Sequence, residues 1–130
     1  MTERLLLDTH AVIWSALDPG RLSPAARLAI EDPGNNIYFS PVSAMEITTK
    51  VRIGKLDLAR PLAAGFADQM AARGFAELPL SAAHAEMAGT FLSANNDPWD
   101  RLLAAQARIE KLGLITNDSE MGDFGARLFW

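Results

Sequence analysis

Four acidic residues stand at the ends or beginnings of apolar segments, from which their carboxylates could act together in a folded chain. Asp8 follows the apolar run of three leucines at residues 5–7, and Asp118 follows another short apolar run. Glu46 and Asp100 each lie near the start of an amphipathic segment. Carboxylates that share a site repel one another unless they are protonated or bind a cation, and oxygen ligands favour Mg²⁺ or Mn²⁺. Such a site points to phosphoryl chemistry.

The elements that must position these residues follow from the alternation of short apolar runs with longer amphipathic segments. This alternation is typical of βα units around a mostly parallel sheet. Strands are predicted over residues 4–8, 36–40, 75–80, 114–116 and 127–130. Helices are predicted over residues 9–17, 22–32, 43–53, 61–73, 81–92 and 97–113, with Gly113 at the end of the last one. Ligands of open parallel sheets bind beyond the carboxyl ends of the strands, so the four acids are expected to converge there.

Two of the acids also fit ordinary helix capping. Ser43 and Glu46 match a capping box, in which the glutamate reaches back to the serine amide. Asp97 followed by Pro98 matches an N-cap, which places Asp100 at the third helical position. A carboxylate there is stabilised by the helix dipole by about 0.3–1 kcal/mol. These two positions alone therefore do not establish a functional site.

The other two acids differ in how well a structural role explains them. Asp118 could open a turn together with Asn117 and Ser119. Asp8 fits a purely structural role least, because an acid that ends a buried strand needs a partner. His10 and His84 are the two histidines of the chain, and neither belongs to a recognisable triad or zinc-ligand spacing. There is also no glycine-rich phosphate loop.

The composition narrows the class of protein. A chain of 130 residues with 49% hydrophobic residues is expected to form a single domain, residues 1–130, around one core. The absence of cysteine excludes disulfides and zinc–thiolate sites. Neither a signal peptide nor a membrane-spanning run is visible, so a cytoplasmic location is expected.

The charge pattern bears on nucleic-acid binding. A net charge of −4 argues against general phosphate binding. The segment that carries Lys50, Arg52, Lys55 and Arg60 against the single Asp57 is a local exception. It is either a solvated surface or a contact for a partner that bears phosphates.

Four segments together carry a resemblance to a known family: "LLLDTHAVIW", "SPVSAMEITTKVRIGKL", "DPWDRLLAAQA" followed by "LITND", and the terminal "LFW". In this order and at these spacings the chain resembles the PIN-domain ribonucleases, specifically the VapC-type toxins of bacterial toxin–antitoxin pairs. The resemblance spans almost the full length. It implies an α/β fold with three α/β/α layers around a central, mostly parallel sheet.

The resemblance also implies a site and partners. The acids that match the family motif are Asp8, Glu46, Asp100 and Asp118, which in such proteins hold one or two Mg²⁺ or Mn²⁺ ions for hydrolysis of RNA. The other implied partners are an antitoxin with a basic C-terminal segment and, within that complex, a second copy of the chain as a homodimer. Residues expected to support the acids are Thr9, Asp97, Asn117 and Ser119. Lys50, Arg52 and Lys55 are expected to contact RNA phosphates.

The sequence departs from the family pattern near the site. Met45 stands where many relatives have tryptophan, Asn95 and Asn96 replace a histidine and a basic residue, and Trp99 replaces phenylalanine. These changes leave the acids intact but weaken any inference about substrate contacts.

Three alternatives remain at this point. A phosphotransferase of the haloacid-dehalogenase type would need a second aspartate where His10 stands. A receiver-like domain would need paired acids after the first strand and a later lysine. The third alternative is a non-catalytic binding module with the same fold.

Overall fold

The structure is a computed structural model that describes residues 2–130. Its strands are β1 (Arg4–Leu7), β2 (Asn36–Phe39), β3 (Ala76–Glu77), β4 (Gly113–Ile115) and β5 (Leu128–Phe129). Its α-helices are α1 (Thr9–Leu17), α2 (Pro24–Glu31), α3 (Pro41–Arg52), α4 (Arg60–Ala63), α5 (Phe66–Ala72), α6 (Ala82–Thr90) and α7 (Pro98–Ile109). Three short 3-10 helices complete the fold: η1 (Pro19–Arg21), η2 (Asp57–Ala59) and η3 (Ser119–Phe124).

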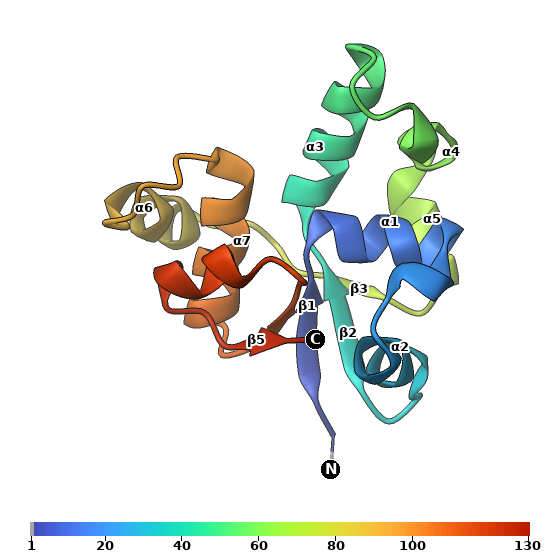
Figure 1. The fold of residues 1–130 in the computed structure, drawn as a ribbon, viewed down its shortest axis with the longest axis horizontal. Helices are drawn as coiled ribbons and strands as arrows, with labels where there is room; N and C mark the ends of the chain where they lie inside the picture. The colour runs from blue at the N-terminus through green and yellow to red at the C-terminus, as the bar shows by residue number, and fades with distance from the viewer. Residues whose placement is uncertain (1) are drawn as a thin grey trace.

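The five strands form one sheet in the order β3-β2-β1-β4-β5, with every neighbouring pair parallel. β1 lies at the centre, where Leu6 pairs with Tyr38 of β2 on one side and with Leu114 of β4 on the other. Helices α1 to α5 lie on one side of the sheet, and α6, α7 and η3 lie on the other (Figure 1). This is the three-layer α/β/α arrangement that the resemblance implies.

The apolar core explains why β1 is the central strand. Leu5 and Leu7 belong to the cluster under α1 to α5, whereas Leu6 belongs to the cluster under α6 and α7. Successive side chains of a strand point to opposite faces, so a strand covered on both faces must be apolar at every position. The prediction of a buried central strand at this segment is therefore confirmed, although the strand ends at Leu7 and not at Asp8.

Several predicted boundaries are wrong. The helix predicted over residues 61–73 is two helices, because Gly65 adopts a left-handed φ of 68° between α4 and α5. Gly113 does not end α7 but is the first residue of β4. A Cβ at Gly113 would lie 2.8 Å from Leu5 Cδ2, so this glycine permits close packing inside the sheet. The strand predicted over residues 75–80 shortens to Ala76–Glu77.

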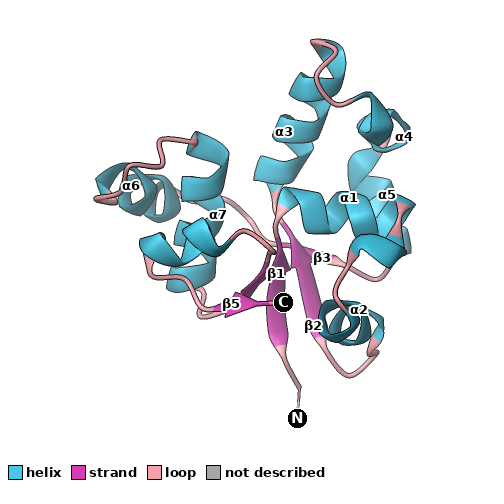
Figure 2. Ribbon diagram, in the orientation of Figure 1, coloured by secondary structure: helices cyan, strands magenta, loops and turns pink. Residues whose placement is uncertain are grey.

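Helix α3 rises beyond the carboxyl ends of the strands (Figure 2). Of the helices in residues 2–130, none has the length and apolar character that crossing a bilayer requires.

Candidate functional site

Asp8 lies at the carboxyl end of β1 and is the N-cap of α1. Its Oδ1 accepts a 2.7 Å hydrogen bond from the Ala11 amide, and its own amide donates to the Ile115 carbonyl at 3.0 Å. The residue is 9% exposed. Burial is the main cause that raises the pKa of this carboxyl to about 6. Hydrogen bonds from Thr116 and Ala11 oppose the rise, and the negative charge of Glu46 adds to it.

Glu46 lies in α3, the helix that follows β2, and is 6% exposed. Its Oε2 accepts from Lys50 Nζ one helical turn further on, at 2.5 Å. The predicted capping box is wrong. The helix begins at Pro41, its N-cap is Ser40, and Ser43 lies inside its first turn. Glu46 is therefore free of any capping role, and its carboxylate is directed to a cation.

Asp100 lies in the first turn of α7. The N-cap is Asp97, as predicted, with Oδ1 accepting from the amides of Trp99 at 2.8 Å and Asp100 at 3.2 Å. The Asp100 carboxylate accepts a 3.2 Å bond from the side-chain amide of Asn95. Because α7 leads into the start of β4, its own N-terminus lies at the carboxyl edge of the sheet.

The pKa of Asp100 shows which charges surround it. Partial burial is the largest cause that raises this pKa to about 6. The charges of Asp97, Asp118 and Glu46 raise it further, and the hydrogen bond from Asn95 lowers it. Asp100 therefore lies near enough to Glu46 of α3 and to Asp118 after β4 for their charges to raise its pKa. Such proximity is expected of acids that converge at one edge of the sheet.

Asp118 follows β4 and is the N-cap of η3. Its Oδ1 accepts from the Glu120 amide at 3.0 Å, and its own amide donates to Thr116 Oγ1 at 3.1 Å. Thr116 is buried and also lowers the pKa of the Asp8 carboxyl. It thus connects two of the four acids, a role that the sequence analysis missed although the residue stands within "LITND". The neighbouring Asn117 and Ser119 are exposed.

A buried polar contact joins the helices that follow β1 and β2. Thr9 at the start of α1 shares a 3.0 Å hydrogen bond with Ser43 of α3. Thr9, predicted to orient an acid or a water, therefore contacts a neighbouring hydroxyl in this structure.

A second buried contact joins α3 to α7. Ser40 donates to Gln106 Oε1, and the Gln106 amide donates to the Leu78 carbonyl at 3.1 Å. Ser40 and Gln106 are fully buried, and neither was identified from the sequence. These bonds set α7 against the helix that carries Glu46.

The four carboxylates form one electrostatic group without forming a closed metal cage. Each accepts a hydrogen bond from a protein group, and across residues 2–130 no three acidic or histidine side chains approach closely enough to hold a metal ion. The donor chemistry nevertheless fits a hard divalent cation, because all four ligands are oxygen and two of them resist ionisation. A bound cation would relieve that resistance.

The predicted basic strip divides in the structure. Lys50 is half-buried and paired with Glu46, whereas Arg52 and Lys55 are exposed. Arg60 pairs with Asp57 at 2.9 Å on the surface. Arg52 and Lys55 are therefore the members of the strip that remain available to a phosphate.

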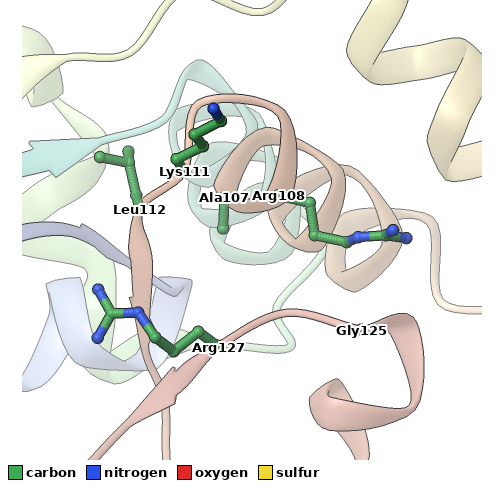
Figure 3. Close-up of a pocket in the computed structure, with 6 residues that line it drawn as sticks. All are labelled: Ala107, Arg108, Lys111, Leu112, Gly125 and Arg127. Atoms are coloured by element: carbon green, nitrogen blue, oxygen red, sulfur yellow. The ribbon is translucent and has the colours of Figure 1, made fainter.

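Two hollows flank the α7 half of the molecule. One, of about 380 Å³, lies between the α6–α7 connection and η3 and is lined by Ser93, Ala94, Asn95, Asn96, Glu120 and Asp123. It adjoins the acidic group, since Asn95 contacts Asp100. The other is lined by Arg108, Lys111 and Arg127 among its residues, but their charged groups point away from one another (Figure 3). Such divergence does not make an anion site.

The family model described as "PIN domain" matches residues 5–126. A search of curated proteins gave no match. Among solved structures, VapBC2 from Rickettsia felis bound to a DNA fragment from its promoter is similar, with a TM-score of 0.66, 19% identity and 97% of each chain covered.

Two further structures have the same fold. FitAB bound to an IR36 DNA fragment has a TM-score of 0.60 at 21% identity, covering 96% of this chain and 93% of that one. FitAcB from Neisseria gonorrhoeae has a TM-score of 0.59 at 22% identity, covering 97% of this chain and 96% of that one.

Proposed function

The chain belongs to the PIN domain family, and from this premise we propose that it is a metal-dependent endoribonuclease that serves as the toxin of a toxin–antitoxin pair. The observation that carries the proposal is the group of Asp8, Glu46, Asp100 and Asp118, contributed by separate elements at the carboxyl edge of the sheet. Burial and mutual repulsion there favour a cation, which a purely structural set of caps would not need.

The proposed cation is Mg²⁺ or Mn²⁺, which when bound supplies the positive charge and Lewis acidity needed to hydrolyse a phosphodiester. The chain supplies the rest. The four carboxylates would hold the ion, while hydrogen bonds from the Asn95 side chain and the Ala11 amide keep Asp100 and Asp8 oriented. Lys50 engages only Oε2 of Glu46, so Oε1 of that carboxylate is the oxygen that would bind the ion.

RNA binding on this acidic chain needs cations of its own. Without a bound ion the acidic group repels phosphates, so the substrate must be held by neighbouring basic side chains. Arg52, the last residue of α3, and Lys55, in the turn that follows, are both exposed, and the ion pair to Glu46 engages Lys50 instead. We assign them the flanking phosphates, with Asp97, Asn117 and Ser119 supporting the acids.

We propose that a partner protein inhibits the chain by placing positive charge at the same acidic residues. A partner protein with a basic C-terminal segment would place an arginine or lysine near Asp8, Glu46 and Asp100, as Lys50 already does for Glu46. The similar VapBC2 and FitAB structures each hold a DNA fragment, so we expect the complex of this chain with its partner to bind DNA as well. We propose in addition that a second copy of the chain forms a homodimer within that complex. Exposed Met45, Ile53 and Leu58 offer apolar surface for the same segment.

The test of catalysis is cleavage of labelled RNA by the purified chain with Mg²⁺, with Mn²⁺ and with excess EDTA. Cleavage should require the metal, stop with EDTA and return when metal is restored. A chain that binds Mn²⁺ but cleaves no RNA while hydrolysing a phosphomonoester would favour a phosphatase. A chain that does neither would be a non-catalytic binding module.

The test of regulation first identifies the proposed partner among the products of genes that neighbour the gene of this chain. The basic residue of that partner nearest the acids is then truncated to alanine. Inhibition should weaken even if the complex persists. Equal inhibition by the truncated and intact partners at saturation would mean that RNA access is blocked at a distance.

A further inference from the structure

A single side chain fixes the connection between α6 and α7. Arg101, in the first turn of α7, donates to four backbone carbonyls, those of Ala88 and Phe91 at 3.0 Å, Ser93 at 3.2 Å and Asn95 at 2.9 Å. Residues 91–97 contain neither helix nor strand, so few backbone bonds of their own hold them. The guanidinium therefore determines the path of this connection.

Arg101 does not act as a counter-ion for the acid beside it. No ion pair between Arg101 and a carboxylate occurs within residues 2–130, although Asp100 is its neighbour in sequence. Its rigid fork of donors is instead used on carbonyl groups, where charge-assisted hydrogen bonds are strong and directional. Its function in the structure is therefore to hold backbone.

The connection that Arg101 holds carries the residue that orients Asp100. The Asn95 side-chain amide donates to Asp100 Oδ2 at 3.2 Å, and its Oδ1 accepts from the Asp97 amide at 2.9 Å. The backbone carbonyl of the same Asn95 accepts from Arg101 Nε. The Arg101 guanidinium thus holds the backbone of Asn95, the residue whose side chain bonds both to Asp97, the N-cap of α7, and to Asp100.

We propose that Arg101 is a positioning residue of the acidic site, acting through Asn95 to hold the Asp100 carboxylate in place for cation binding. This inference rests on the proposed function, because it assigns Arg101 a part in the same site. Loss of the guanidinium should free residues 91–97, and Asn95 would no longer restrain Asp100.

The chain offers a matched control on the same helix. Phe91 and Phe124 stack with ring centroids 5.1 Å apart, with Arg101 over Phe124 and Arg108 over Phe91, each 5.6 Å from the ring centroid. Arg108 donates one bond, to the Phe124 carbonyl at 3.1 Å, and none to residues 91–97. Methionine at either position removes a similar cation–π contact, but only the change at Arg101 releases the connection.

The experiment compares Arg101→Met, Arg108→Met and Asn95→Ala at a temperature where all three are folded. Two readouts need no RNA: Mn²⁺ binding by electron paramagnetic resonance and hydrogen exchange of residues 91–97. Arg101→Met and Asn95→Ala should each weaken Mn²⁺ binding by about 10-fold, within the range typical of groups that orient metal ligands. The double variant should lose little more than either single one, since both act on one path. Arg108→Met should stay within about twofold of wild type on the same measure.

The results separate this inference from the proposed function. Wild-type Mn²⁺ affinity or unchanged hydrogen exchange in Arg101→Met would overturn the positioning role, and so would an equal loss in Arg108→Met. Failure of the wild-type chain to bind Mn²⁺ would overturn it too. Mn²⁺ binding without RNA cleavage would refute the nuclease while leaving the positioning result intact. Should Arg101→Met fail to fold, Arg101→Lys keeps the charge without the fork and should show a smaller loss in the same direction.

Discussion

Asp8 and Glu46 lie against the fully packed centre of the molecule, whereas Asp100 and Asp118 lie beside irregular segments at its edge. The first two are buried, and the elements that carry them are joined by the Thr9–Ser43 bond between α1 and α3. The second two are partly exposed and precede or follow connections without strand or α-helix. The same site is thus built in two different ways.

The difference shows what each half requires. The first half is buried against the core, and burial is the largest cause of the raised pKa of Asp8. The second half is fixed by polar side chains, so Asp100 depends on Asn95 and on the connection that precedes α7. The pKa nevertheless reaches about 6 in both Asp8 and Asp100, because burial is the largest cause in each and the charges of three further acids add to the rise at the more exposed Asp100.

The largest effect should come from neutralising one acid in each half. We expect Asp8→Asn and Asp118→Asn each to reduce metal-dependent RNA cleavage by more than about 100-fold, beyond the loss typical of outer-shell groups. Both variants should fold, because asparagine also caps helices. Gel-based cleavage rates measure this, with Asp97→Asn as the milder control. Wild-type cleavage by either variant would remove that half from the site.

The second largest effect should be a difference between the two halves in how the free energy of unfolding depends on pH. The pKa of Asp8 is raised from 3.8 to about 6, so the folded state binds its proton more tightly than the unfolded state. The resulting stabilisation is full below about pH 4 and is lost as pH rises through about 6. The metal-free wild type should therefore lose about 2–3 kcal/mol from this group between pH 4 and pH 7.

The Asp8→Asn variant removes that titration, so at pH 7.5 without metal its Tm should exceed that of wild type by roughly 5 °C or more. Asp100→Asn should gain less, because solvent screens its half-exposed carboxyl. Thermal unfolding followed by circular dichroism across pH 4–8 measures both. Adding Mg²⁺ should stabilise wild type and not Asp8→Asn. A parallel pH curve for wild type and Asp8→Asn would contradict the assigned shift.

A smaller effect should follow from cutting one polar contact in each half. Thr9→Val leaves the buried Ser43 hydroxyl unpaired, which costs about 1–3 kcal/mol of unfolding free energy. Asn95→Ala, in the exposed half, should cost about 0.5–1.5 kcal/mol. Urea unfolding gives both values. With both variants folded, Asn95→Ala should lose more of the cleavage rate; the opposite order would mean that the core-held half is the more sensitive one.

The smallest effect concerns RNA phosphates outside both halves. Replacing Arg52 and Lys55 by alanine should weaken RNA binding and lower the slope of log K against log salt by roughly 1.4, at about 0.7 for each lost contact to a single strand. Mg²⁺ binding should be unchanged, since neither side chain contacts an acid of the site. Arg27→Ala, on α2 and paired with Glu31, is the control. An unchanged slope would leave Arg52 and Lys55 as solvated surface.

The sequence by itself determined the elements and the chemistry of the candidate ligands. The continuous apolar run of β1 identified a strand covered on both faces, and Asp97 before Pro98 identified the N-cap of α7. Both patterns involve only residues that are close together in the sequence, so they can be recognised without knowledge of the fold. The hard-oxygen character of the four acids likewise follows from residue type alone.

Only the tertiary structure decided which partner each group takes. Thr9 and Ser43 are 34 residues apart in sequence, and Ser40 and Gln106 are 66 apart, so no local pattern predicts their bonds. Ser40 and not Ser43 caps α3, because the helix begins at Pro41 and the Ser40 hydroxyl accepts from the Val42 amide at 3.0 Å. Arg101 stands in the segment "DPWDR", but the sequence does not show which groups its guanidinium binds. It reaches the carbonyls of Ala88 and Phe91 in the folded chain, where Phe91 stacks on Phe124 of η3.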